Sequence, residues 1–431
     1  MRLRTALITA AAAGLSAALA GGTAASAATA PSGRNISWTA SWASAPQPPV
    51  ASSTAFGPNW STDGFSAQTV RQTIRLSSGG GQVRLRLSNQ YGTQPLTVSG
   101  ATVAEARSGG AGIQPGTMRA VTFHRARSVT IPAGRATASD AAALPVTPLE
   151  SLTITLYFAG PTGPSTFHED GLTTTYRAAG DHVADPGSGA FAGATSHSYY
   201  YLDGVDVAGG RSRGTVVAFG DSISNGHNST VGASARYSDV LAGRLAAAHI
   251  PLGVANAGIT GNLLLSQVPC FGQAGLARFQ RDALGQPGVR TVILLEGTND
   301  IWDSRNIPAC GITPAVTARQ LIGGYQTLIR AAHARGVRVL GVTMLPFKAS
   351  YEQPADFAQA EAIRQEVNHW IRTSGQYDAV ADFASVVADP ADPQQLNPAY
   401  DSGDHLHPND AGYRALADAV NLADLPVSRP R

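Results

Sequence analysis

Four short segments of the chain carry polar residues of the types that perform acyl transfer. They are Gly220–Ser224, Asn256–Asn262, Glu296–Asp300 and Asp404–Pro408. The first three directly follow apolar runs that read as strands, and the fourth lies in a late loop. In an open parallel sheet, the residues that follow the strands meet along one edge, where ligands bind. We therefore expect the four segments to face one another.

The residue types in these segments form a complete set for nucleophilic catalysis at an ester carbonyl. A serine is a weak nucleophile until a base takes its proton, and Ser222 is the candidate nucleophile. His407 can act as that base, and Asp404, three residues earlier, can hold its ring. The oxyanion of the tetrahedral intermediate needs donors already in place, which the backbone N–H groups of Ser222 and Gly258 and the Asn299 amide can supply. This reaction requires no metal and no organic cofactor.

The order of the four segments resembles that of the four sequence blocks of the SGNH (GDSL-type) hydrolase superfamily. The resemblance spans the C-terminal half of the chain and implies a flavodoxin-like α/β/α fold and ester hydrolysis. It implies that Ser222 is the nucleophile, that Gly258 and Asn299 serve the oxyanion hole, and that His407 is the general base, with Asp404 completing the triad. The G-x-S-x-G elbow of the α/β-hydrolases is absent around Ser222.

Each of these residues also has a structural interpretation. Ser222 could be a helix N-cap, and His405, close to His407, raises the alternative of a metal site, although such a site needs ligands from elsewhere. Asp221 and Glu296 are expected to be structural carboxylates. Asn256 and Asn262 could brace the oxyanion loop or only cap turns, and Asp300 and Trp302 could contact substrate or pack at the surface.

The elements that must position these residues lie in a predicted domain at 214–424. Continuous apolar runs predict parallel strands buried on both faces, at Thr215–Phe219, Val254–Asn256, Thr291–Leu295, Val337–Val342 and Ala379–Ala381. Helical segments fall between them and after them, at Tyr237–Ala248, Ala274–Leu284, Pro314–Ala334, Phe357–Thr373 and Asn409–Asn421. Alternation of strands and helices predicts a three-layer α/β/α domain with a parallel sheet.

A different pattern precedes this domain, over residues 35–205. Period-two alternation at Val70–Leu76, Val83–Leu87 and Ser151–Phe158 predicts strands covered on one face. We therefore expect an antiparallel, jelly-roll-like β-sandwich, joined to the next domain by a polar linker at 206–213. Trp38–Trp42 and Gln68–Gln72 resemble the start of a β-domain that precedes the hydrolase domain in some actinobacterial GDSL lipases, phospholipases and esterases. This domain could bind carbohydrate or contribute loops to the rim of the active site.

The aromatic residues of this region allow two interpretations. Trp38, Trp42 and Tyr199–Tyr201 could form a sugar-binding face, but we expect them to fill the core of the sandwich.

The first 27 residues have the features of a secretory signal peptide. Arg2 and Arg4 precede an apolar run that ends near Ala20, and Ala25–Ala27 forms an A-x-A cleavage site. The run is too short and too rich in alanine for a stable membrane anchor. We therefore expect a secreted, extracellular protein.

The chain has two cysteines, Cys270 and Cys310. In an oxidising compartment we expect them to form a disulfide. The loop of roughly 40 residues would be worth on the order of 4 kcal/mol in the chain-entropy account.

The composition and net charge limit the classes of partner that we expect the chain to bind. With 431 residues, 43% of them hydrophobic and a formal charge of only +2, the chain is expected to fold into packed cores and to bind no nucleic acid. The first expected substrate is a lipid ester, and the second is a feruloyl or acetyl ester of plant cell walls. We expect the protein to be a monomer. The alternative is not an enzyme but a carbohydrate- or surface-binding protein whose triad is inactive. Its partners could include cell-wall polysaccharide.

Overall fold

The computed structural model describes residues 36–53, 56–301, 314–350 and 356–427. Ser37–Arg431 forms one compact unit. The predicted signal peptide, Cys310 and Trp302 lie outside the described residues. The expected Cys270–Cys310 disulfide and the role of Trp302 therefore remain predictions.

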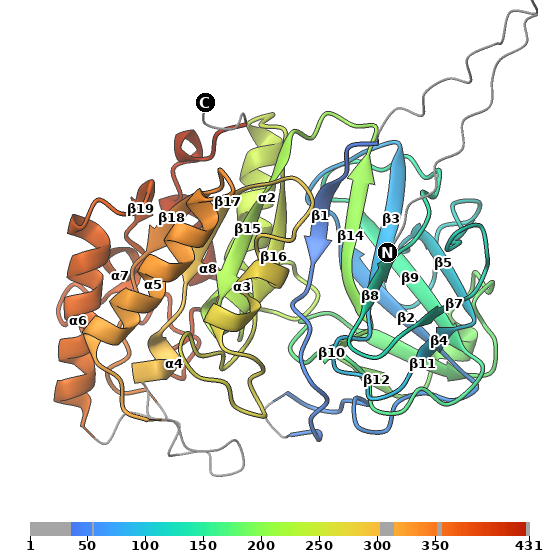
Figure 1. The fold of residues 1–431 in the computed structure, drawn as a ribbon, viewed down its shortest axis with the longest axis horizontal. Coiled ribbons are helices and arrows are strands. Elements are labelled where there is room, and N and C mark those ends of the chain that lie inside the picture. The colour runs from blue at the N-terminus through green and yellow to red at the C-terminus, as the bar shows by residue number, and fades with distance from the viewer. Residues whose placement is uncertain (1–35, 54–55, 302–313, 351–355, 428–431) are drawn as a thin grey trace, which may run out of the picture. The chain divides into compact units, whose positions relative to one another are not determined.

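Residues 37–208, here called the β-region, consist mainly of two antiparallel sheets (Figure 1). The four-stranded sheet has the order β1 (Thr39–Ala43), β14 (Leu202–Ala208), β3 (Gln82–Ser88), β8 (Ala136–Ala138). The six-stranded sheet has the order β12 (Thr195–Ser196), β11 (Thr175–Ala179), β2 (Gln68–Arg75), β9 (Ser151–Phe158), β5 (Gly100–Glu105), β6 (Arg119–Ala120). Two smaller pairs are β4 (Leu96–Val98) with β7 (Val129–Ile131) and β10 (Phe167–His168) with β13 (Tyr199–Tyr200). The predicted β-rich architecture is confirmed.

Of the aromatic residues named above, Trp42 and Tyr199–Tyr201 lie in the core of the β-region, as expected. Trp38 does not, because it is only half-buried and its ring lies under the Arg84 guanidinium, 4.5 Å from the ring centroid. Trp42 and Tyr199–Tyr201 are each at most 4% exposed. Trp60 stacks on Tyr200 with ring centroids 5.4 Å apart. These rings are therefore not available to form an exposed sugar-binding face.

The second part of the chain is a three-layer α/β/α domain, as predicted. Its parallel sheet has the order β16 (Leu252–Gly258), β15 (Gly214–Gly220), β17 (Val289–Leu295), β18 (Arg338–Val342), β19 (Ala379–Ala381). One face packs on α3 (Gly275–Asp282), α5 (Ala318–His333) and α6 (Phe357–Thr373), and the other on α2 (Tyr237–Ala247), α7 (Phe383–Val387) and α8 (Asp410–Ala419) (Figure 1). Two single-turn helices follow strand ends: α1 (Ser222–Asn225) begins two residues after Gly220, the last residue of β15, and α4 (Thr298–Ile301) begins two residues after Glu296.

The predicted linker at 206–213 starts inside a strand, which corrects that boundary. β14 continues to Ala208, and the Asp206 carboxylate is fully buried between Arg84 Nε at 2.8 Å and Arg86 Nε at 3.1 Å. Asp206, the polar residue that suggested a linker, is therefore a buried carboxylate shared by two arginines. The connection between the two regions is only the segment 209–213.

The β-region and the α/β domain share packing and hydrogen bonds. Ala40 and Ala43 of β1 belong to the same hydrophobic core as the parallel sheet. Ser77 Oγ donates to the Val254 carbonyl at 2.9 Å and accepts from the Val254 N–H at 2.7 Å. The edge strand β16 is therefore covered by the β-region.

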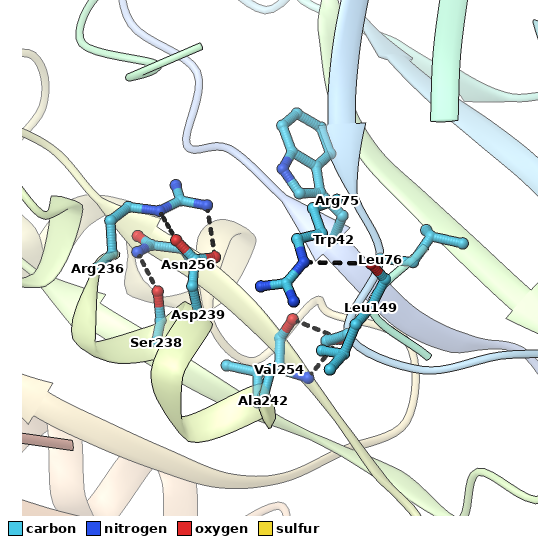
Figure 2. A pocket seen from close by; sticks show the side chains of 11 residues that line it. Trp42, Arg75, Leu76, Leu149, Arg236, Ser238, Asp239, Ala242, Val254 and Asn256 are labelled. Atoms are coloured by element: carbon cyan, nitrogen blue, oxygen red, sulfur yellow. Dashed lines mark hydrogen bonds and ion pairs between the residues drawn. The ribbon is translucent and has the colours of Figure 1, made fainter. Parts of the chain in front are cut away.

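Figure 2 shows a cavity at this junction, lined by Trp42 and Arg75 of the β-region together with residues of α2 and β16. At its wall Arg236, just before α2, pairs with Asp239 at 2.7 Å. Ser222 and His407 are not among the residues that line it. The cavity therefore belongs to the junction of the two regions and not to the residues expected to do the chemistry.

Within the described residues, no helix combines the length and apolar character needed to cross a membrane.

Candidate active site

Ser222, His407 and Asp404 converge although 185 residues separate the first two. Ser222 Oγ lies 2.8 Å from His407 Nε2, and His407 Nδ1 lies 2.7 Å from Asp404 Oδ2. Ser222 and His407 are only 5% and 3% exposed. A hydroxyl, an imidazole and a carboxylate in this order can pass the hydroxyl proton to the ring and stabilise the resulting imidazolium.

Local structure fixes the position of Ser222. Asp221 is the N-cap of α1, because its Oδ1 accepts a hydrogen bond from the Ile223 N–H at 3.0 Å. As the first residue of a helix, Ser222 has an N–H with no intrahelical acceptor. Asp221 is thus structural, as expected, and Ser222 is not itself the cap.

Asp404 and His407 are held by one turn. Asp404 Oδ1 accepts hydrogen bonds from the N–H groups of Leu406 and His407 at 2.9 and 2.8 Å. Asp404 Oδ2 also accepts one from the Asn228 amide at 2.8 Å. Asn228 follows α1 closely in the chain, and its role was not foreseen from the sequence.

The electrostatics suit a base and its orienting group. Burial alone would raise the pKa of Asp404, but the hydrogen bond and charge of His407 and the two backbone N–H groups hold it well below its usual range. Burial lowers the pKa of His407, against the opposing effect of Asp404. Asp404 is therefore ionised and His407 neutral near pH 7, the states that a proton-accepting imidazole requires.

His405 points to a different partner. Its backbone is in the left-handed region, with φ 62°, and its Nδ1 lies 2.5 Å from Asp401 Oδ2. Among the described residues, no group of three or more His, Cys, Asp or Glu side chains is arranged to hold a metal ion.

Gly258 does not offer a free N–H, which departs from the expectation for the oxyanion hole. Its N–H donates to Asn256 Oδ1 at 2.8 Å. A Cβ on Gly258 would lie 2.2 Å from the Asn225 nitrogen. This glycine therefore allows α1 to pack closely on β16, a requirement that also selects for glycine in the sequence.

The loop after β16 contains a second glycine, Gly261, with φ +78°. Within the described residues, no acceptor is found for its N–H. The next residue lies beside the predicted oxyanion amide, because Asn299 Nδ2 donates to the Asn262 carbonyl at 2.8 Å. One hydrogen of the Asn299 amide remains for a substrate oxygen.

Asn256 and Asn262 brace this loop. Asn256 Nδ2 donates to the Ser224 carbonyl at 2.7 Å, which ties β16 to α1. Asn262 Nδ2 donates to the carbonyls of Phe271 and Gln273 at 2.7 and 2.8 Å.

Asp300 binds the backbone of the loop after β16. Its carboxylate accepts from the N–H groups of Leu264 and Leu265 at 2.7 and 2.9 Å. It is a buried structural carboxylate and not a surface contact for substrate.

A buried arginine, Arg278 of α3, joins the strand ends beneath the site. Its guanidinium donates to the carbonyls of Gly220 and Ala257, to Asn262 Oδ1 and to Glu296 Oε1, at 2.7 to 2.9 Å. Burial raises the pKa of Glu296 well above its usual range, against the opposing effect of Arg278. Glu296 is thus a structural carboxyl, as expected. No sequence pattern pointed to Arg278, since it lies on a helix between the four segments that carry the expected site residues.

The β-region also reaches the site. Asp170 Oδ2 lies 2.7 Å from His227 Nδ1, and the His227 ring contacts the His407 ring with centroids 4.7 Å apart. The possibility that the β-region contributes to the rim was foreseen, but neither residue was.

Comparisons with known proteins follow the same division of the chain. Residues 218–415 match the model of the GDSL-like Lipase/Acylhydrolase family. Among the curated proteins, none matches this chain.

Similar solved structures each cover about half of the chain. An M. smegmatis aryl esterase is 17% identical, with 48% of this chain and 95% of that one covered and a TM-score of 0.37. An acetyl xylan esterase from Geobacillus stearothermophilus is 21% identical, with 51% and 98% covered and a TM-score of 0.37. A GDSL-like lipase from Bacteroides thetaiotaomicron is 19% identical, with 49% and 88% covered and a TM-score of 0.37. The α/β domain of this chain is thus similar to the GDSL-like lipase/acylhydrolase family over residues 218–415, and this match supports the hydrolysis of carboxylic esters as its class of reaction.

Proposed function

We propose that this protein is a secreted serine ester hydrolase that acts through a covalent acyl-enzyme. The observation that carries the proposal is the unbroken chain of two hydrogen bonds, 2.8 Å from Ser222 to His407 and 2.7 Å from His407 to Asp404. Ser222 Oγ attacks the ester carbonyl and its proton passes to His407 Nε2. His407 then protonates the leaving alcohol, and the acyl group stays on Ser222. In the second half, His407 takes a proton from water, which releases the acid and restores Ser222.

The oxyanion is stabilised by the Ser222 N–H and the free hydrogen of the Asn299 amide. A third donor is the N–H of Gly261, which replaces Gly258 in this role. Two observations support this choice, the acceptor already bound to Gly258 and the hydrogen bond of 2.8 Å between the neighbouring Asn262 and Asn299. Loss of one such donor costs roughly 3 kcal/mol of transition-state stabilisation.

Lipid esters are the proposed substrate class, of the lipase, phospholipase or lysophospholipase type. The support is the lipase and acylhydrolase character of the family that residues 218–415 match. The test is a profile on p-nitrophenyl esters from acetate to palmitate, with phosphatidylcholine, methyl ferulate and acetylated xylan beside them. Preference for long acyl chains and phosphatidylcholine supports a lipid ester, and preference for the ferulate or the xylan contradicts it.

Export is part of the proposal. Residues 1–27 are removed as a signal peptide, and Cys270 and Cys310 pair in the oxidising compartment. The supports are the basic start, the apolar run and the A-x-A site. The N-terminal sequence of the protein recovered from culture medium tests this, and a mature chain that still begins at Met1 contradicts it.

The catalytic proposal is tested by Ser222→Ala, with Ser224→Ala of the same helix turn as the matched control. We expect Ser222→Ala to lose nearly all hydrolysis of p-nitrophenyl acetate, by roughly 10⁶-fold in kcat as for other serine hydrolases. Ser224→Ala keeps the nucleophile Ser222, so we expect it to keep the activity that Ser222→Ala loses. Full activity of Ser222→Ala contradicts the proposal.

A further inference from the structure

A second carboxylate–imidazole pair lies against the proposed base. His227 Nδ1 is 2.7 Å from Asp170 Oδ2, and the His227 ring meets the His407 ring edge to face, with centroids 4.7 Å apart and planes at 74°. His407 is thus in contact with Asp404 on one side and with His227 on another. The two pairs come from different parts of the chain, because Asp170 belongs to the β-region.

The backbone of His227 is fixed to the nucleophile segment. Its N–H donates to the carbonyl of Ser222 at 3.0 Å. Its own carbonyl accepts from Tyr413 Oη of α8 at 2.6 Å. The His227 ring also contacts Phe56 of the β-region, with centroids 5.5 Å apart. The ring therefore has a defined position relative to Ser222.

Asp170 is equally well fixed. Its Oδ2 accepts from Thr260 Oγ1 at 2.9 Å and from Asn225 Nδ2 at 3.1 Å, and its carbonyl accepts from the same amide at 2.9 Å. Two residues earlier, His168 Nε2 lies 2.9 Å from Asn225 Oδ1. The segment 168–170 is therefore joined both to the end of the nucleophile helix and to the loop after β16.

We propose that the Asp170–His227 pair positions the His407 imidazole, and that through it the β-region is a required part of the hydrolase centre. The inference rests on the proposed function, since it needs His407 to act as the base. A catalytic base works only when it is held within hydrogen-bond reach of the proton it takes, and supporting contacts supply that precision. Because the two rings are in edge-to-face contact, the His227 ring limits the orientations open to the His407 ring.

The charge of His227 also acts on His407. Burial lowers the pKa of His227, but the hydrogen bond and charge of Asp170, and the charge of Asp404, raise it above its usual value. Burial lowers the pKa of His407, and the positive His227 lowers it further. His227 is therefore already protonated at the pH at which His407 gains its proton.

The other titratable groups around His227 do not supply this positive charge. Burial lowers the pKa of His168, which favours its neutral form. Burial raises the pKa of Tyr413 far above its usual value. Arg236, which interacts with Asp170 through its charge, is paired with Asp239. Removal of His227 should therefore raise the pKa of His407.

The test is His227→Gln in the full-length protein, assayed for p-nitrophenyl acetate hydrolysis across pH. We expect kcat to fall about tenfold or more through loss of ring alignment, with KM changed much less. We also expect the acid limb of kcat/KM to move to higher pH. A purely structural role would lower the rate without this movement of the acid limb.

Asp170→Asn provides a second route should His227→Gln fold poorly. It keeps the size of the side chain but loses the charge that holds His227. We expect kcat to fall, and the double variant to lose no more than the worse single one, because residues that act as a unit are not additive. The matched control is His182→Gln in the β-region, where His182 Nδ1 lies 2.7 Å from Asp185 Oδ2 in a partly exposed pair. It should leave both the rate and the acid limb unchanged.

The outcomes separate this inference from the proposed function. A folded His227→Gln with the parental kcat, or with a lower kcat and the parental acid limb, overturns the inference. If Ser222→Ala is inactive in the same assay, the proposed function stands regardless. If Ser222→Ala is active, the proposed function fails first.

Discussion

At the scale of single residues, the chemistry depends on the protonation state of His407. Its ring is almost fully buried and keeps a neutral form ready to accept a proton, while Asp404 remains ionised beside it. Burial lowers the pKa of the base and the carboxylate raises it, and burial has the larger effect here.

The pH dependence of hydrolysis follows from this balance. Activity requires neutral His407, so kcat/KM rises as pH increases through the pKa of His407 in the free enzyme. Because that pKa is lowered from 6.5, the midpoint of the acid limb is expected below pH 6.5. The measurement is kcat/KM for p-nitrophenyl acetate from pH 4 to 9, and a midpoint above 6.5 contradicts the expectation.

The same shift affects stability, with a sign that can be derived. The pKa of His407 is lower in the folded chain than in the unfolded one, so its neutral form favours folding. This contribution is present above pH 6.5 and is lost as pH falls through the folded pKa.

At the scale of elements, the site depends on how closely α1 approaches the sheet. Gly258→Ala places a methyl group 2.2 Å from the Asn225 nitrogen. Because this neighbour is backbone, we expect a loss of about 1–3 kcal/mol in the free energy of unfolding.

The matched control is Gly243→Ala in α2, where no atom lies within 4 Å of the new Cβ. It should stabilise the helix by about 0.5–1 kcal/mol. Urea unfolding of both variants measures the two effects, and equal stability of the two variants would refute this account.

Arg278 holds the ends of β15, β16 and the following loop together. Arg278→Met leaves Glu296, both strand-end carbonyls and Asn262 without their donor. Breaking a fully buried pair costs on the order of 3 kcal/mol, less if Glu296 takes up a proton. The control is Arg372→Met, which removes a half-exposed pair with Asp382 worth about 0–1 kcal/mol. A similar loss of unfolding free energy in both variants would show that the Arg278 network stabilises the fold no more than the half-exposed Arg372–Asp382 pair does.

The elements of the α/β domain could be predicted from the sequence because their strands are buried on both faces. Such strands read as unbroken apolar runs, and the residues that follow them must meet at one edge of the sheet. The triad was therefore accessible to reasoning from strand ends. The Asp170–His227 pair was not, since Asp170 lies in a segment with no periodic pattern and its contact depends on how the β-region docks.

Two further departures have physical causes. Gly258 was expected to expose its N–H, but a glycine is equally required where a helix backbone approaches a strand. Asp206 suggested a linker, since an aspartate in a Gly-containing polar stretch usually lies in solvent. Here two arginines from the neighbouring strand β3 compensate its burial.

At the scale of the whole molecule, the β-region and the α/β domain behave as one compact unit from Ser37 onward. They share a hydrophobic core through β1, and hydrogen bonds join Ser77 to Val254 and Asp170 to Asn225. We expect a single cooperative thermal transition in differential scanning calorimetry, with equal calorimetric and van't Hoff enthalpies. Two separate transitions would show that the regions fold independently. The monomeric state expected from the sequence stays a prediction that sedimentation can test.

The central claim is that Ser222 is an activated nucleophile, and covalent labelling tests it most directly. A fluorophosphonate reacts with a serine only when a base removes its proton, so we measure the rate and site of labelling by peptide mass spectrometry. The account predicts one adduct per chain, on Ser222 and not on Ser224, formed much more slowly in His407→Ala. An adduct elsewhere, or equal labelling of Ser222 without His407, would contradict it.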